Sequence, residues 1–173
     1  MPNIGGPRSS KRLLFARVVS SVLLYGAPIW AKALEIGANK RLMDRVYRLS
    51  AIRVCSAFRT ASGEATWVIA GMLPIDIIAD EGKRIYDAKK GNLLSGPGIK
   101  RKERDRSMQI WQDRWSTSQK GRWTYKLIPK IELWINRNHC EVNYHLKQFV
   151  TGHGGYRSYL HKYGHDDSPF CPA

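Results

Sequence analysis

The sequence predicts an all-α protein: a compact helical bundle, then a basic linker, then an irregular helical arm. Apolar residues recur at helical spacing in several separate segments, and no segment shows the strict alternation typical of a half-buried strand. Gly and Pro residues separate these segments. We therefore expect about four helices in residues 1–91, a linker in residues 92–106 and the arm in residues 107–173.

The chain of 173 residues is strongly basic, with 29 Lys and Arg against 14 Asp and Glu and a net charge of +15. Such an excess predicts a polyanionic partner, with nucleic acid as the first candidate and an anionic membrane surface as the second. Three widely spaced cysteines do not resemble a disulfide framework, which indicates a reducing compartment. We expect an intracellular protein, nuclear or cytoplasmic and not secreted, because no signal-peptide cleavage site follows the first apolar run.

The longest apolar run spans Leu13–Leu34. Its density predicts a buried central helix that is kinked at Pro28, capped by Ser9 or Ser10 and ended by Gly37. A membrane span is the competing interpretation. We favour the buried helix, because the uninterrupted apolar part is shorter than the roughly 20 residues that a bilayer requires.

A second helix is expected from a cap at Asn39 to about Arg59. Its basic residues Arg41, Arg45 and Arg48 recur at helical spacing on a face of their own. Guanidinium groups grip phosphate oxygens in a fork, so this stripe predicts contact with a nucleic-acid backbone. A solvated helix face is an equally acceptable interpretation. The predicted inward face consists of Met43, Tyr47, Val54 and Phe58, widened by Leu42, Val46 and Leu49.

Two further helices complete the predicted bundle. Ser62 is placed to start a short third helix, and Pro74 to be the first residue of a fourth. Acidic residues lie at the start of the fourth helix and basic residues at its end, which suits the helix dipole, and Gly91 ends it. The residues expected to face the core from this helix are Ile75, Ile78 and Ile85.

The segment 92–106 changes composition, and Gly96, Pro97 and Gly98 within it disfavour regular structure. We expect a linker that touches nucleic acid through a run of charges. A solvated flexible hinge or a nuclear-import patch would explain the same run. The basic residues of this run are Lys100, Arg101, Lys102, Arg104 and Arg106.

A fifth helix follows, with Met108, Trp111 and Trp115 at helical spacing and Gly121 at its end. The tryptophans could stack on bases, although an aromatic stripe at this spacing is more often core. Two short helical faces are expected after it, one between Asn138 and Gly152 and one ended by Gly164. Their apolar residues are Val142, Leu146, Phe149 and Val150 in the first, and Tyr156, Tyr159, Leu160 and Tyr163 in the second.

Adjacent carboxylates at Asp166 and Asp167 resemble a two-metal site, but their Gly, Ser and Pro neighbours indicate a polar loop instead. The His and Cys residues of the arm have no paired zinc-finger spacing, so all of them except Cys171 are better interpreted as polar surface or capping residues. No Gly-rich phosphate loop, nucleophile with its base or pair of buried carboxylates is apparent. The residues therefore predict a binding module that has no cofactor of its own and no catalytic activity.

Two blocks, LLYGAPIWA and GRWTYKLIPKIELWINRNHCEVNYHLKQFVTGHGGYRSYLHKYGHDDSPFCP, carry a specific resemblance. They are similar to the C-terminal part of the reverse-transcriptase polyprotein of non-LTR retrotransposons, specifically the R-one clade of type-1 elements. The resemblance implies that residues 1–91 are the helical thumb. It further implies that residues 92–173 are the linker arm, which reaches the first cysteine, Cys171, of a truncated zinc knuckle.

The same resemblance implies a role without catalysis. The family's polymerase aspartates and their Mg would lie in a palm upstream of Met1, as would the endonuclease, and Zn would require a complete knuckle. A thumb grips the template and primer, here RNA, an RNA–DNA hybrid or DNA, during target-primed reverse transcription. Its expected partners are therefore nucleic acid and the palm and endonuclease of the parent polyprotein, with no membrane.

Two origins fit this resemblance: a fragment of the polyprotein, in which Met1 is internal, or a truncated genomic remnant. The competing function is a non-catalytic remnant or domesticated interaction module that binds a protein or an anionic surface.

Overall fold

The structure, a computed structural model, describes residues 6–91, 97–137, 143–154 and 156–170. Over these residues the chain is all-α, with ten α-helices, one 3-10 helix (η1) and no strand, which confirms the predicted fold class. The elements are α1 (Ser9–Leu23), α2 (Ala27–Trp30), η1 (Ala31–Glu35), α3 (Gly37–Cys55), α4 (Gly63–Ala70), α5 (Ile75–Lys90), α6 (Pro97–Thr117), α7 (Arg122–Leu127), α8 (Ile131–Ile135), α9 (Tyr144–Thr151) and α10 (Arg157–Lys162).

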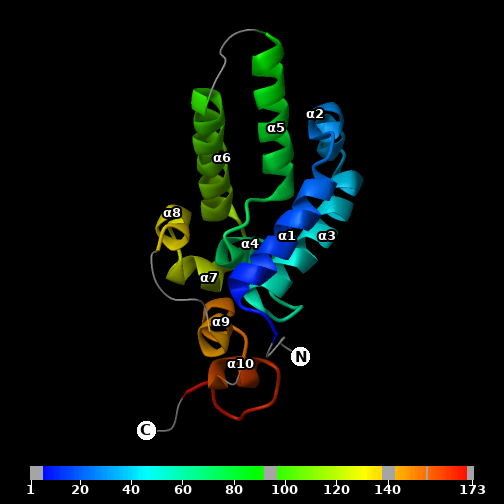
Figure 1. The fold of residues 1–173 in the computed structure, drawn as a ribbon. Coiled ribbons are helices and arrows are strands. Elements are labelled where there is room, and N and C mark those ends of the chain that lie inside the picture. The colour runs from blue at the N-terminus through cyan, green and yellow to red at the C-terminus, as the bar shows by residue number, and fades with distance from the viewer. Residues whose placement is uncertain (1–5, 92–96, 138–142, 155, 171–173) are drawn as a thin grey trace.

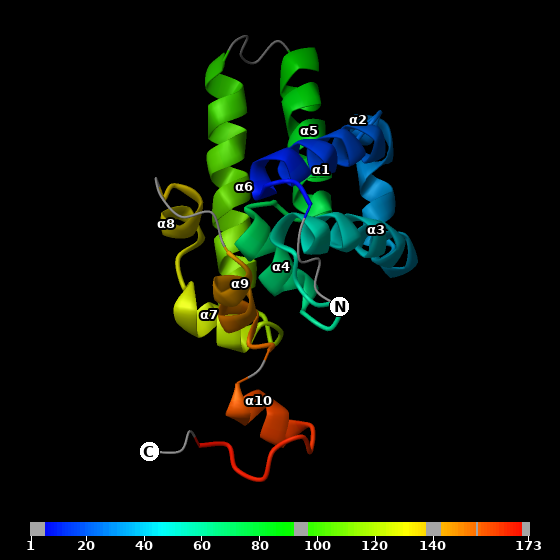
Figure 2. The same ribbon diagram turned by 60° about the horizontal axis from the view of Figure 1, so that its bottom comes forward.

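Two pairs of helices frame the molecule (Figure 1). The long helices α5 and α6 run antiparallel and side by side, while α1 lies against α3 across one side of them. The short α4 packs on α3, and α2 packs on α5. Helices α7 and α9 lie near the end of α6, α8 lies beside α6, and α10 lies farthest from the α5–α6 tip (Figure 2).

One hydrophobic core joins residues from Ala16 to Val150. Trp111 and Trp115, on α6, are its largest fully buried side chains. The indole Nε1 of Trp115 donates a hydrogen bond to the carbonyl of Ile128 at 2.8 Å, so its polar edge is satisfied inside the protein. Burial confirms the core interpretation of the two tryptophans and removes both from any stacking on bases.

The buried central helix predicted for Leu13–Leu34 is wrong. Gly26 adopts a left-handed conformation, with φ +65°, and breaks the segment after α1. Pro28 is the second residue of the next helix and does not kink a continuous one. A bend of 59° separates α1 from Ala27–Glu35. Ala16 is the one buried residue of α1, because that helix packs on α3 along a single narrow side.

The helix ends show which local signals were reliable. Ser62 caps α4, since its hydroxyl accepts a hydrogen bond from the Ala65 amide at 3.2 Å, as predicted. Gly91 follows α5 as expected, and Pro74 lies one residue before that helix. The caps predicted at Ser9 or Ser10 and at Asn39 are wrong, because these residues lie inside α1 and α3.

Gly37 likewise starts α3 rather than ending the preceding element. Asn39, inside α3, instead donates through its amide to the carbonyl of Ala33 at 3.0 Å, which ties η1 to α3. On α3 the predicted inward residues Tyr47 and Val54 are buried. The residues expected to widen that face, Leu42, Val46 and Leu49, are exposed.

An irregular linker is wrong for residues 97–106, which form the first turns of α6. Pro97 suits the first position of a helix, where its missing amide costs nothing. Ile99 is buried and Ser107 is fully buried against the neighbouring helix, so tertiary contacts hold this charge-rich segment in helical form. The remaining predicted linker residues, 92–96, lie outside the described part of the chain.

In the arm, α9 lies within the interval expected for the first short helix, with a cap at Asn143 whose side chain accepts from the Leu146 amide. Helix α10 ends shortly before Gly164. Asn138 and Val142 lie outside the described residues. Helices α7 and α8 are too short for their apolar period to be recognised in the sequence.

Within the described residues, no single helix combines the length and the apolar composition that a membrane span requires. Helix α1 and Ala27–Glu35 satisfy those two criteria only when taken together across their bend.

Gly121→Ala should destabilise the protein by about 2 kcal/mol. Alanine is strained in the left-handed conformation of this position, and its Cβ would crowd a neighbouring side chain. Gly121 has φ +70°, and a Cβ there would lie 3.0 Å from the ring of the buried Trp115. Gly82→Ala is the matched control. Gly82 lies inside α5, and a Cβ added there would meet no atom within 4 Å, so alanine should stabilise by about 0.5–1 kcal/mol. Urea unfolding measures both, and equal effects would contradict the packing described for Trp115.

Candidate nucleic-acid interface

The eight basic residues predicted to contact nucleic acid fall into two groups that differ in what their side chains already bind. Two of the eight, Arg48 and Arg104, are engaged inside the protein. The other six are exposed, and none of the six forms an ion pair within the described residues. The six are Arg41, Arg45, Lys100, Arg101, Lys102 and Arg106.

Arg48 holds the connection between α3 and α4. Its Nη2 donates to the carbonyl of Ala61 at 2.6 Å and also to the carbonyl of Arg59. These bonds satisfy two backbone carbonyl groups of the loop between α3 and α4. Arg48 is therefore a structural clamp rather than a free cation.

Arg104 pairs with Glu81, at 3.1 Å between Nη2 and Oε1. The carboxylate of Glu81 is buried in α5, where an unpaired charge would be costly. The second oxygen of Glu81 has no hydrogen-bond partner within the described structure. Arg104 therefore compensates a buried charge, which leaves less of its own charge for a ligand.

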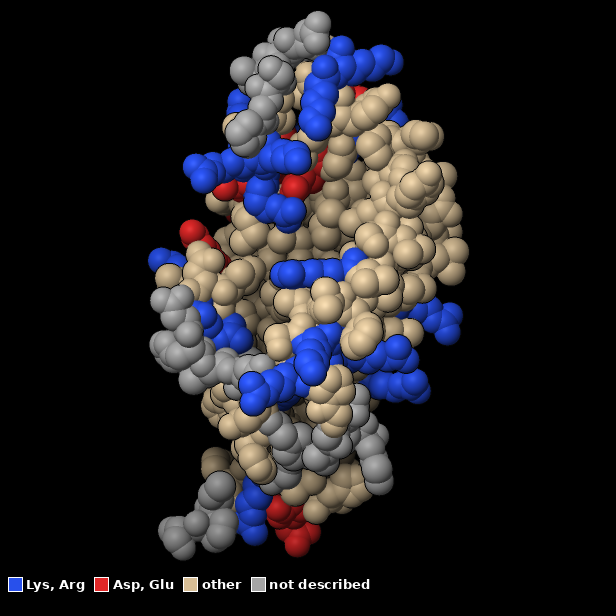
Figure 3. Space-filling view, viewed as in Figure 1, with Lys and Arg blue, Asp and Glu red and all other residues tan. Residues whose placement is uncertain are grey.

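The tip of the α5–α6 hairpin gathers the free cations most densely. Lys89 and Lys90 end α5, and Lys100 to Lys102 lie in the first turns of α6, which runs antiparallel beside it. Lys and Arg side chains cover this end of the molecule in Figure 3. We call these five exposed residues the basic tip: Lys89, Lys90, Lys100, Arg101 and Lys102.

Sequence reasoning missed Lys89 and Lys90 as part of this surface, because their place at a helix C-terminus already explained them through the dipole. The antiparallel packing of α5 and α6 supplies the missing observation. It brings the last turn of one helix beside the first turn of the next, so two short charge runs become one surface.

Arg41 and Arg45 are also exposed, but they lie on α3, away from the basic tip. Arg114 and Lys40 both bind Asp76, so the start of α3 lies level with the later turns of α6. Lys100 is 14 residues before Arg114. At 1.5 Å per residue the two levels are about 20 Å apart. The structure thus resolves the predicted surface into two separate sites.

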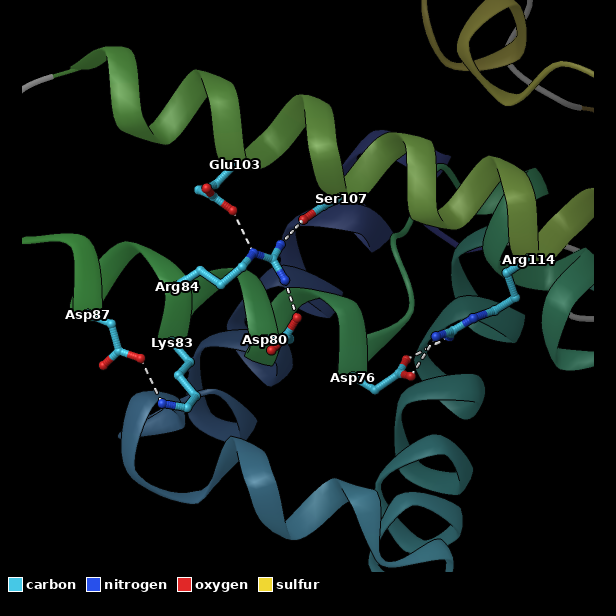
Figure 4. A network of polar contacts seen from close by, with 8 residues as sticks. All are labelled: Asp76, Asp80, Lys83, Arg84, Asp87, Glu103, Ser107 and Arg114. Carbon is cyan, nitrogen blue, oxygen red and sulfur yellow. Dashed lines mark hydrogen bonds and ion pairs between the residues drawn. The ribbon is translucent and has the colours of Figure 1, made fainter. Parts of the chain in front are cut away.

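A polar network between α5 and α6 positions the basic tip (Figure 4). Arg84 donates from Nε to Glu103 at 2.5 Å and from Nη2 to the hydroxyl of Ser107 at 3.0 Å, and its Nη1 binds Asp80. Charge-assisted bonds to a half-buried arginine have restrictive geometry. They therefore set how far α6 is shifted along α5, and with it which cations lie together at the tip.

A second junction lies at the other end of the hairpin, where Arg114 donates two bonds to Asp76, at 2.9 and 2.8 Å, and Lys40 binds the same carboxylate. Burial raises the pKa of Asp76, but the hydrogen bonds from Arg114 and Lys40 outweigh it and hold the pKa below its ordinary value of 3.8. Asp76 therefore stays ionised and joins α3, α5 and α6.

Asp44 lies beside this junction, and its pKa is shifted in the opposite direction to that of Asp76. Burial raises the pKa of its carboxyl group; the charge of Lys40 opposes that rise and the charge of Asp76 adds to it. Its Oδ1 is buried with no hydrogen-bond partner in the described structure. Asp44 thus weakens the fold at neutral pH.

No cluster of three or more His, Cys, Asp or Glu side chains that could hold a metal occurs among the residues that the structure describes. Asp166 lies in the loop that the sequence predicted and forms an ion pair with Arg157 at 3.3 Å. Cys55 is buried, and burial raises the pKa of its thiol to about 11. Cys171, the predicted ligand of an incomplete zinc site, lies outside the described residues, as do His139 and Cys140.

Fold and surface together define a basic all-α chain in which Asp76, Glu81 and Glu103 bind cations of neighbouring helices. Many of its other cations are exposed at the surface. Its sequence relatives are Pol polyproteins of retrotransposons. The chain is 28% identical over 178 residues to a "Retrovirus-related Pol polyprotein from type-1 retrotransposable element R1" of Bradysia coprophila. It is also 28% identical over 179 residues to a protein of the same description from Nasonia vitripennis.

A third relative, the "Putative 115 kDa protein in type-1 retrotransposable element R1DM" of Drosophila melanogaster, is 28% identical over 180 residues. Each match covers 95% of this chain, but 18% of the Bradysia and Drosophila proteins and 51% of the Nasonia protein. No family model and no solved structure matches the chain. The resemblance to R1-type non-LTR retrotransposon polyproteins is confirmed, and the thumb-and-linker position stays a prediction.

Asp76→Asn should lower the free energy of unfolding by about 2 kcal/mol at pH 7, because Arg114 and Lys40 lose their shared counter-charge. The loss is smaller than for a fully buried pair, since both cations remain about a third exposed. A lowered pKa contributes stability above pH 3.8 that disappears as pH falls through the folded value. Urea unfolding of both proteins from pH 7 to 3 should therefore converge at low pH, and a constant gap would contradict the ionised junction.

Asp44→Asn should have the opposite sign and raise the free energy of unfolding at pH 7. The raised pKa of Asp44 means that its ionised form is disfavoured by folding, so removal of the charge relieves that penalty. The gain should shrink as pH falls and the native carboxyl becomes protonated. The same titration checks this, and destabilisation at pH 7 would show that Asp44 has a role in the junction that its burial does not explain.

Proposed function

We propose that this chain binds nucleic acid through its phosphate backbone, as the thumb and linker of a retrotransposon polyprotein that performs target-primed reverse transcription. Its ligand is RNA, an RNA–DNA hybrid or DNA. The chain itself positions the template and primer, and nucleotidyl transfer, with its Mg, belongs to the palm of the parent protein. The proposal follows from the relationship to R1 Pol polyproteins and from the exposed cations.

The observation that carries the proposal is the unbalanced charge of the basic tip. All five cations are exposed and unpaired within the described structure, while the nearby carboxylates of Asp87 and Glu103 are bound by Lys83 and Arg84. A surface of this kind attracts phosphates and releases their counterions on binding. Contacts of this class fix orientation on a duplex and convey no base sequence.

The two cationic sites suit an extended ligand. Arg41 and Arg45 lie about 20 Å from the tip along the direction of α6. A duplex presents phosphates continuously, at about one charge per 1.7 Å of axis, so one molecule can reach both sites. A small anion would occupy one site alone.

Replacing Lys100, Arg101 and Lys102 together by alanine should weaken binding to a labelled RNA–DNA hybrid and flatten its salt dependence. Each lost phosphate contact should reduce the slope of log K against log salt by about 0.9, up to about 2.7 for three. Fluorescence anisotropy across a salt series measures the slope. Arg41→Ala with Arg45→Ala should reduce it by up to about 1.8.

The matched control replaces three exposed lysines near α7, at the end of α6 away from the tip, and so removes the same charge: Lys120, Lys126 and Lys130. It should leave the slope nearly unchanged. Equal losses in the control and the tip variant would mean that net charge, not the tip, drives binding. Binding that ignores salt would sink the proposal and favour a remnant or an interaction module.

A further inference from the structure

The first three helices carry an apolar surface that no described part of the chain covers. Tyr25 and Ile29 are 87% and 90% exposed, and Val22 is 71% exposed. We call the whole set the apolar face, which consists of Leu14, Phe15, Val18, Val22, Tyr25, Ile29, Leu42, Val46 and Leu49. Exposed side chains of this size usually occur singly on a soluble surface.

Helix geometry places six of these residues in two rows. Leu14, Val18 and Val22 recur every fourth residue, so they form a row along α1, on the side away from buried Ala16. Leu42, Val46 and Leu49 form a similar row on α3, the helix against which α1 packs. Figure 3 shows a broad uncharged area over this side of the molecule. Exposed apolar rows on two helices that pack together indicate an interaction site.

The charges around the apolar face restrict its partner. Residues 6–34 include five Lys or Arg and no Asp or Glu. Arg17 on α1, Lys32 on η1, and Arg41 and Arg45 on α3 are exposed. A second copy of this chain would bring a like-charged rim and a further net charge of +15 against them, which opposes dimerisation. The matching surface has an apolar centre and carboxylates at its rim.

The relatives supply a source for such a surface. The aligned region is 18% of the Bradysia and Drosophila polyproteins, so most of each polyprotein lies outside it. A segment attached in the same chain is present at an effective concentration of about millimolar, so a modest apolar contact suffices to hold it. Interfaces that remain assembled are more apolar than the surrounding surface, as this face is.

We propose that the apolar face docks another segment of the Pol polyprotein, whose contacting surface is apolar with an acidic rim. The α3 row is then shared between functions: Leu42, Val46 and Leu49 meet the polyprotein, while Arg41 and Arg45 at its edge remain open to phosphates. Docking thus orients the nucleic-acid surface relative to the rest of the polyprotein.

The test is association in trans between this chain and the Bradysia polyprotein from which the aligned segment has been deleted. The wild-type chain should bind it, and Val18→Glu with Val22→Glu should weaken binding at least tenfold, as for central residues of an interface. The control, Thr60→Glu with Gln119→Glu, adds the same charge at exposed polar positions outside the face and should bind like wild type.

Three further measurements make the outcome decisive. Thermal unfolding should be unchanged in the Val18→Glu, Val22→Glu variant, because both side chains are exposed. Its affinity for the RNA–DNA hybrid should fall less than twofold, which separates this inference from the proposed function. Light scattering of the chain alone should give a monomer.

A dimer that the variant abolishes would assign the face to a second copy and overturn the proposal. Binding to phosphatidylserine vesicles that the variant abolishes, without binding to the polyprotein, would assign it to a membrane surface and overturn it also. No complex with the deleted polyprotein, or equal binding by the variant and wild type, overturns it outright.

Discussion

The carboxylate of Asp76 is the contact on which the arrangement of the longest helices depends. From the first turn of α5 it binds Arg114 of α6 and Lys40 of α3, so one group fixes three helices that are far apart in the chain. At the other end of the hairpin, Arg84 binds Asp80 and Glu103 and thereby aligns α5 with α6. In a chain with 14 acidic residues against 29 basic ones, carboxylates engaged at these junctions leave the surplus of cations at the surface.

That surplus is distributed unevenly, and its distribution gives the molecule two different surfaces. Free cations concentrate where the last turn of α5 lies beside the first turns of α6, and at the edge of α3. The outer side of α1 and α2 is apolar and has no acidic residue beside it over residues 6–34. A charged surface that depends on counterion release and an apolar surface that depends on dehydration respond to different partners. The two surfaces can therefore be tested separately.

A place within a Pol polyprotein, as proposed above, would account for the exposed apolar side of this chain. The chain spans about half of one Nasonia relative and less than a fifth of the Bradysia and Drosophila relatives. An element that packs within a larger protein needs an apolar face that a free monomer would not expose. The broken segment at Gly26 belongs to this face: the bend turns α2 onto α5 and leaves Tyr25 and Ile29 outside.

The sequence by itself determined the all-α class, the cap at Ser62, the end of α5 at Gly91 and the inward spacing of Trp111 and Trp115, because these depend on local periodicity and on backbone preferences. It also predicted the excess of basic residues, which follows from composition. Tertiary structure decided which cations are free: the acceptors that engage Arg48 and Arg104 come from a loop and a neighbouring helix. It also decided that much of the first apolar run stays exposed and that residues 97–106 of the expected linker are helical. Both depend on which distant surfaces meet, and a local pattern does not specify that.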